Sequence, residues 1–138
     1  MKCLILISLI GISYGLPGGA PYCADKPGHF GTSPQTGPSG VTATTDIAED
    51  GSVLITVSAD PPFKGILITG TAASGQFIVP AGQPLHTMTL CKGITHESSE
   101  LKSEVSAIFV KDDPTENAEF NLIIVRDFTT YWTDIQFS

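Results

Sequence analysis

Short runs in which apolar and polar residues alternate recur through most of the chain. In the run 52–58, Val53, Ile55 and Val57 alternate against Ser52, Thr56 and Ser58, and the run 102–111 shows a similar pattern. A period of two is typical of a β-strand with one buried face, whereas a helix repeats its apolar positions about every 3.6 residues. No run sustains the helical period. The sequence therefore predicts an all-β protein.

Turn residues divide this region into seven or eight predicted strands. They lie at 41–47, 52–58, 63–71, 76–79, 85–90, 102–111, 118–126 and 131–137. The two prolines after Asp60 are predicted to end one strand, and the polar stretch 92–101 is predicted to be a loop. Strands that recur about every 10–15 residues favour a β-sandwich over alternating strands and helices.

Residues 1–15 have the pattern of a cleaved signal peptide. A lysine precedes a short apolar stretch, and Ser13 and Gly15 supply the small residues found at cleavage sites. A membrane anchor is the alternative, but a span needs about 20 apolar residues and this stretch is shorter. We expect secretion, with cleavage after Gly15 or else after Ala20, and one domain over residues 16–138.

Residues 16–40 contain five prolines and six glycines and almost no large aliphatic side chain. Because proline and glycine disfavour regular structure, we expect an extended N-terminal segment that runs over the surface of the domain. Cys3 leaves with the signal peptide, so Cys23 and Cys91 remain. An even pair of cysteines in an oxidising compartment predicts one disulfide, which would fix the segment to the domain.

The charge of the chain excludes two classes of partner. Fourteen acidic residues stand against seven basic ones, and the net charge is −7. Duplex nucleic acid is excluded because its binding depends on neutralising phosphates. A membrane-disrupting cationic peptide is excluded because such peptides need a face rich in Lys and Arg. No second apolar stretch is long enough for a membrane span, and no Asn-x-Ser/Thr sequence is present for N-glycosylation.

Signatures of catalysis are absent from the sequence. It contains no G-x-S-x-G, H-E-x-x-H, phosphate-binding loop or dinucleotide-binding motif, so we expect no enzyme, no catalytic residues and no cofactor. A metal pair of His96 and Glu97 is conceivable, with His29 brought close by the disulfide. The three histidines, which include His86, lack zinc-site spacing, and ordinary hydrogen bonding is favoured for His96. We therefore expect no metal site.

Three further features have both a functional and a structural interpretation. One is an acidic turn with Asp112, Asp113, Glu116 and Glu119. Its oxygen atoms could bind calcium, but a solvated turn is favoured. Lys64 could present a charge to a ligand, although an outward residue that keeps a strand edge soluble is favoured. Trp132 is expected to pack across the core near the disulfide rather than to anchor a binding patch.

Several short motifs follow one another in a recognisable order. They are Leu16–Pro21, Cys23, Pro27, His29, Phe63–Leu67, Cys91, Ile94–His96, Phe120–Arg126 and Tyr131–Trp132. This order resembles the reeler (reelin-like) domain family, and most closely the small secreted reeler proteins of insects that are assigned to defence. The resemblance covers essentially the whole chain after the signal peptide. It implies an immunoglobulin-like antiparallel β-sandwich with a disulfide between Cys23 and Cys91.

The resemblance also implies a function outside the cell. The expected role is innate-immune defence, through antimicrobial action or haemocyte aggregation, with microbial cell-wall components or the haemocyte surface as partners. The alternative is a structural or adhesive extracellular module without a microbial ligand, and a small metal- or ligand-binding carrier is a third class. The sequence indicates no contiguous basic patch and no aromatic cluster from which ligand-binding residues could be named.

Overall fold

Nine β-strands form two antiparallel sheets in the described part of the chain, which comprises residues 18–21, 23–24, 26–29, 31–89 and 91–138 of this computed structural model. The strands are β1 (Val41–Ile47), β2 (Val53–Phe63), β3 (Gly65–Gly70), β4 (Gly75–Ile78), β5 (Leu85–Thr87), β6 (Gly93–His96), β7 (Lys102–Lys111), β8 (Phe120–Val125) and β9 (Tyr131–Phe137). The four-stranded sheet has the order β1-β2-β7-β4, and the five-stranded sheet has the order β5-β6-β3-β8-β9. The predicted signal peptide, residues 1–15, lies outside the described residues.

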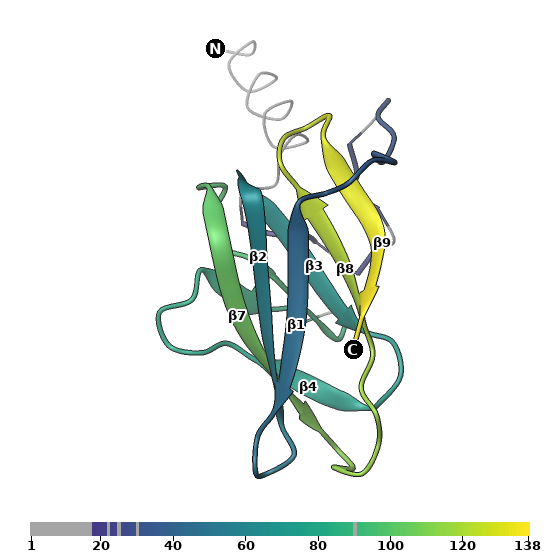
Figure 1. Cartoon of the computed structure of the whole chain (residues 1–138). Coiled ribbons are helices and arrows are strands. Elements are labelled where there is room, and N and C mark those ends of the chain that lie inside the picture. The colour runs from purple at the N-terminus through teal and green to yellow at the C-terminus, as the bar shows by residue number, and fades with distance from the viewer. Residues whose placement is uncertain (1–17, 22, 25, 30, 90) are drawn as a thin grey trace.

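The two sheets pack face to face around an apolar core (Figure 1). Val53, Ile55 and Val57 of β2 are all buried in it, as the alternation predicted. Phe109 of β7 and Phe120 of β8 meet edge to face across the core, with their ring centroids 5.3 Å apart. Since these rings come from different sheets, they join the two layers. The predicted antiparallel β-sandwich is confirmed, with nine strands rather than seven or eight.

Strand β2 continues through the proline pair at 61–62 to Phe63, so the prediction that these prolines end the strand is wrong. Pairing between β2 and β7 is irregular from Ser58 to Phe63. Proline has no backbone N–H to donate to a neighbouring strand. Where the regular hydrogen bonding between β2 and β7 is interrupted, no such donor is needed. The strand can therefore extend beyond its regular pairing.

The predicted strand 63–71 is divided between the two sheets. Phe63 ends β2 in the four-stranded sheet, and Gly65 begins β3 in the five-stranded sheet. Lys64, which was predicted to lie within a strand, is instead the exposed connection between them. Its backbone N–H donates to the carbonyl of Val125, 2.9 Å away, so the crossover is fixed in place.

The predicted loop 92–101 contains strand β6, so this prediction is also wrong. Gly93, Ile94 and Thr95 are all buried between β5 and β3. The polar residues around this short strand concealed it, because a four-residue strand gives too few alternations to be recognised. Thr95 is fully buried even though its side chain is polar, and its hydroxyl donates to the carbonyl of Ile66 at 2.7 Å.

Candidate functional site

The described residues of the N-terminal segment (18–21, 23–24, 26–29 and 31–35) are anchored at both edges of the five-stranded sheet. At the β5–β6 edge, the Nε2 atom of His86 donates to the carbonyl of Gly18 at 2.6 Å, and the N–H of Ala20 donates to the hydroxyl of Thr95 at 3.0 Å. A disulfide joins Cys23 to Cys91 at the same edge, with their Cα atoms 5.9 Å apart. This distance lies in the normal range for disulfides.

The other end of the segment is anchored on β9 and the turn before it. The ring of His29 stacks on Phe128 with a centroid distance of 4.5 Å, and its Nδ1 atom donates to the carbonyl of Phe128 at 2.7 Å. The same ring meets Tyr131 edge to face. The hydroxyls of Thr32 and Tyr131 are hydrogen-bonded to each other at 3.1 Å, and the N–H of Gln35 donates to the carbonyl of Tyr131 at 2.8 Å. The segment therefore crosses the outer face of the sheet from one edge to the other.

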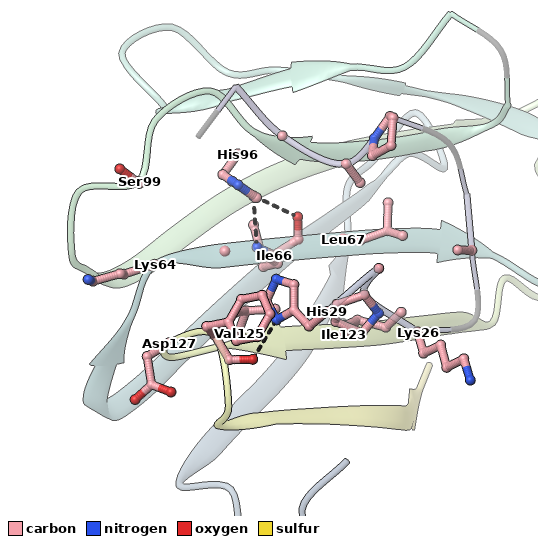
Figure 2. A pocket seen from close by; sticks show the side chains of 18 residues that line it. Lys26, His29, Lys64, Ile66, Leu67, His96, Ser99, Ile123, Val125 and Asp127 are labelled. Carbon is pink, nitrogen blue, oxygen red and sulfur yellow. Dashed lines mark hydrogen bonds between the residues drawn. The ribbon is translucent and has the colours of Figure 1, made fainter. Parts of the chain in front are cut away.

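A pocket of about 480 Å³ lies between this segment and the outer face of the sheet (Figure 2). The sheet side is lined by Leu67, Ile123 and Val125, and Phe128 closes one side. Leu67 and Ile123 are only 6% and 4% exposed although they do not belong to the core between the sheets. Pockets of this size with mostly apolar walls and a few polar groups are typical small-ligand sites.

The polar groups at the pocket include two histidines, two lysines and one carboxylate. In Figure 2, Lys64 and Asp127 lie on one side and Lys26 lies on the opposite side. His29 and His96 lie between them. These groups come from segments far apart in the sequence, so only the folded chain brings them together.

The carboxylate of Asp127 is held by its own turn. Its Oδ1 atom accepts hydrogen bonds from the N–H groups of Thr129 and Thr130, at 3.0 and 2.9 Å, and from the hydroxyl of Thr129 at 3.1 Å. Desolvation is the largest single effect and opposes ionisation, but the hydrogen bonds from Thr129 and Thr130 together outweigh it, so the pKa of Asp127 lies below its ordinary value. A negative charge is therefore fixed at the Lys64 side of the pocket.

A buried lysine shapes the loop beside the pocket. The Nζ atom of Lys102 donates to three backbone carbonyls, those of Lys64, Ser98 and Glu100, at 2.8, 2.6 and 2.6 Å. Desolvation lowers the pKa of this ammonium group, and the nearby charge of Glu100 only partly offsets that effect. These contacts tie the crossover at Lys64 to the loop that carries Ser99, which lines the pocket.

The profile of the reeler domain matches residues 21–137. The chain belongs to the reeler domain family. Reeler domains are non-catalytic modules of extracellular type, and the disulfide agrees with that setting. No curated protein matches the chain.

Solved reeler domains share the fold. The human F-spondin reeler domain (fragment 1) is 14% identical, with a TM-score of 0.62 over 77% of this chain and 91% of that chain. The Reelin-N domain of F-spondin has the same identity and TM-score and is covered to 88%. Human F-spondin reeler domain (fragment 2) is 15% identical, with a TM-score of 0.58 over 78% of this chain and 91% of that chain. At this identity the likeness concerns the fold alone.

The histidines of this reeler domain make hydrogen bonds to the backbone. Nδ1 of His96 accepts from the N–H of Ile66 at 3.1 Å, while His29 and His86 bond to the carbonyls of Phe128 and Gly18. Among the residues that the structure describes, no group of three or more His, Cys, Asp or Glu is arranged to hold a metal ion. In the same part of the chain, no helix has the length and apolar character needed to cross a membrane.

The acidic turn after β7 is occupied by its own hydrogen bonds. Oδ1 of Asp113 accepts from the N–H and the hydroxyl of Thr115, at 3.0 and 2.7 Å. Lys111 donates to the carbonyls of Pro114 and Glu116 from the end of β7. These contacts order the turn through hydrogen bonds among its own residues and Lys111.

Trp132 lies far from the disulfide, so its predicted position in the core is wrong. It is half-buried on β9, whereas Cys91 precedes β6 near the opposite edge of the sheet. Its Nε1 atom donates to the carbonyl of Gly37 at 2.9 Å, and Arg126 lies 4.7 Å above its ring. The ring thus holds the chain that leads from the N-terminal segment into β1.

Sequence reasoning did not find the pocket, although one signal for it was present. Two of the runs, 65–68 and 122–124, are apolar at successive positions instead of alternating. Such runs are typical of strands that are buried on both faces. They indicate that another part of the chain covers the outer face of β3 and β8. The proline-rich N-terminal segment, which was expected to run over the surface of the domain, could have been assigned to this position.

Proposed function

We propose that this reeler domain is a secreted recognition protein of innate defence that binds a microbial surface component in the pocket under its N-terminal segment. The observation that supports the proposal is the pocket itself: apolar walls, a few charged groups at the rim, and two anchored ends of the covering segment. A scaffold with fixed edges presents such a site with little loss of conformational freedom on binding.

Binding rather than chemistry suits the groups that line the pocket. His29 and His96 already bond to backbone atoms, and Asp127 is held by its turn. A recognition role agrees with a family of non-catalytic modules. The expected partners are microbial wall components, with the haemocyte surface as a second binding partner that would couple recognition to cell aggregation.

The test is retention of the protein, secreted from cells that express the full chain, on bacteria, fungi and purified wall polymers. A pocket-filling variant, Val125→Phe, should lose retention because the half-buried Val125 lines the pocket. The matched control is Ile108→Phe, at a half-buried position of β7 on the opposite sheet. Equal retention of the two variants would contradict the proposal.

The same preparation should leave anionic liposomes intact. Each basic residue near an anionic bilayer contributes about 1 kcal/mol of attraction, and an acidic protein lacks a surplus of such residues. Dye release at micromolar protein would show that the protein acts by lysis and would refute the recognition model. Haemocyte aggregation with and without microbes then measures recruitment of cells.

A structural or adhesive module is the second candidate, and the outer face of the four-stranded sheet supports it. Leu54, Ile108 and Ile78 are aligned across β2, β7 and β4 by the pairing of these strands. Leu54 and Ile78 are 40% and 44% exposed, so they form an aliphatic row on an outward face. Loss of cell or matrix adhesion in Leu54→Lys, with full adhesion of Val125→Phe, would favour this candidate.

A further inference from the structure

We infer that the pocket binds a single-chain amphiphile with an acidic head group, whose apolar chain lies on the sheet and whose head group lies at the lysines of the rim. This inference rests on the proposed function in taking the same pocket as the binding site. It adds the chemical class of the ligand.

The apolar chain of the ligand is inferred from the side chains on the sheet side of the pocket. Leu67 and Ile123 lie side by side on β3 and β8, since the two residues are paired in the sheet. Val125 and Phe128 extend this surface. An extended hydrocarbon chain matches such a floor because it buries apolar area along its whole length. A sugar or a nucleotide would leave its hydroxyl groups or charges against these side chains.

The acidic head group of the ligand is inferred from where the Lys and Arg side chains lie. Six Lys and Arg lie in the described part of the chain. Lys102, Lys111 and Arg126 are each bonded to backbone carbonyls, and Arg126 also covers Trp132.

Lys26 and Lys64 are two of the three cations that remain, and both are exposed at the pocket, whereas the third, Lys92, lies elsewhere. In a chain of net charge −7, this places two of the available cations at a single site. Such an arrangement favours an anionic head group.

The position of Asp127 distinguishes the two lysines. Its ionised carboxylate lies on the Lys64 side of the pocket, so it opposes an anion there, while Lys26 lies on the far side (Figure 2). We therefore expect Lys26 to contribute more to binding than Lys64. Removal of the Asp127 charge should tighten the binding of an acidic ligand.

The test is a titration of the secreted protein with dodecanoate below its micelle concentration, followed by methyl NMR and calorimetry. Saturable shifts of the Leu67 and Ile123 methyl groups are expected. Acetate, which has the head group without the chain, should cause none. Dodecyl maltoside, which has the chain with an uncharged head group, should bind more weakly than dodecanoate.

Variants that remove single charges show whether each charged side chain strengthens or weakens the binding of dodecanoate. Lys26→Gln should raise the Kd for dodecanoate about two- to fivefold, as expected for one exposed ion pair, and Lys64→Gln should raise it less. Asp127→Asn keeps the Oδ1 acceptor of the turn and should lower the Kd. The control Lys92→Gln removes an exposed lysine outside the pocket and should leave the Kd unchanged.

Two results would overturn the inference. One is the absence of saturable methyl shifts with dodecanoate, and the other is an unchanged Kd in a variant that combines Lys26→Gln and Lys64→Gln. Retention on microbes without dodecanoate binding would overturn the ligand class and leave the proposed function standing. Dodecanoate binding with the expected charge effects, but without retention on microbes, would support the ligand class and overturn the proposed function.

Discussion

The two sheets of the sandwich bury their inner faces in the same way but differ on their outer faces. On the five-stranded sheet, Leu67 and Ile123 point outward and are nevertheless buried, because the N-terminal segment on the other side of the pocket lies over them. On the four-stranded sheet, Leu54 and Ile78 also point outward and stay about 40% exposed. The core between the sheets therefore explains why the chain folds. The covered outer face of the five-stranded sheet explains why a binding site can form there.

Of the changes that would uncover the outer face of the five-stranded sheet, loss of the disulfide should reduce the unfolding free energy most. The bridge closes a loop with a sequence separation of 68 residues, and a loop of this length is worth about 4 kcal/mol in the chain-entropy model. The Cys23→Ser, Cys91→Ser variant should lose about this much unfolding free energy in a denaturant titration, and its N-terminal segment should become protease-sensitive first. Mass spectrometry of the unreduced wild type should find no alkylatable thiol at either position, and two such thiols would refute the bridge.

Removal of the buried Thr95 hydroxyl, which lies under the N-terminal segment, should cause the next largest loss of stability. Thr95→Val removes the partner of both the Ala20 N–H and the Ile66 carbonyl, and unpaired buried groups of this kind cost about 1–3 kcal/mol. Thr56 lies on the outer face of the four-stranded sheet, so Thr56→Val should change stability by less than about 0.5 kcal/mol. Equal losses in the two variants would show that the outer faces do not differ in the way described.

The two buried lysines at the ends of β7 provide a sharper comparison. Lys102 binds three carbonyls beside the pocket, and Lys111 binds two carbonyls in the acidic turn. Replacement of either lysine by Met should cost about 1–3 kcal/mol, because carbonyls lose a charged donor. Only Lys102→Met should also weaken retention on microbial walls, since only Lys102 orders a wall of the pocket. A similar loss of retention in Lys111→Met would refute a positioning role for Lys102.

The smallest effect is expected at two turns that each hold a hydrogen-bonded carboxylate, one at Asp50 between β1 and β2 and the other the acidic turn after β7. Hydrogen bonds from the hydroxyl and N–H of Ser52 lower the pKa of Asp50 below its ordinary value of 3.8, and those of Thr115 do the same for Asp113. A carboxyl with a lowered folded pKa stabilises the protein above the unfolded value, and this contribution is lost as the pH falls through the folded pKa.

Denaturant midpoints measured between about pH 5 and pH 2 should therefore decrease less in the Asp50→Asn, Asp113→Asn variant than in the wild type. Asn keeps the Oδ1 acceptor and does not titrate, which makes it the appropriate replacement. Parallel curves for the two proteins would contradict the role assigned to these turns.

Most of the sandwich could be predicted because its inner faces follow a local rule. Val53, Ile55 and Val57 alternate with outward residues, so the burial of one face is visible in the sequence. Strand β6 escaped prediction because it is short and its buried Thr95 resembles a loop residue. The pocket escaped because its walls depend on contacts between residues as distant as His29 and Phe128, which no local pattern encodes.

The hydrogen bond between His86 and Gly18 would make the pocket sensitive to where the predicted signal peptide is cleaved. Cleavage after Gly15 retains Gly18, while cleavage after Ala20 removes it together with the N–H of Ala20 that bonds to Thr95. The second cut would also create a new α-amino group on Pro21, which lines the pocket, and such groups are largely protonated at neutral pH. If the predicted signal peptide is removed, the position of the cut would determine how firmly the covering segment is held and whether the site gains a third positive charge.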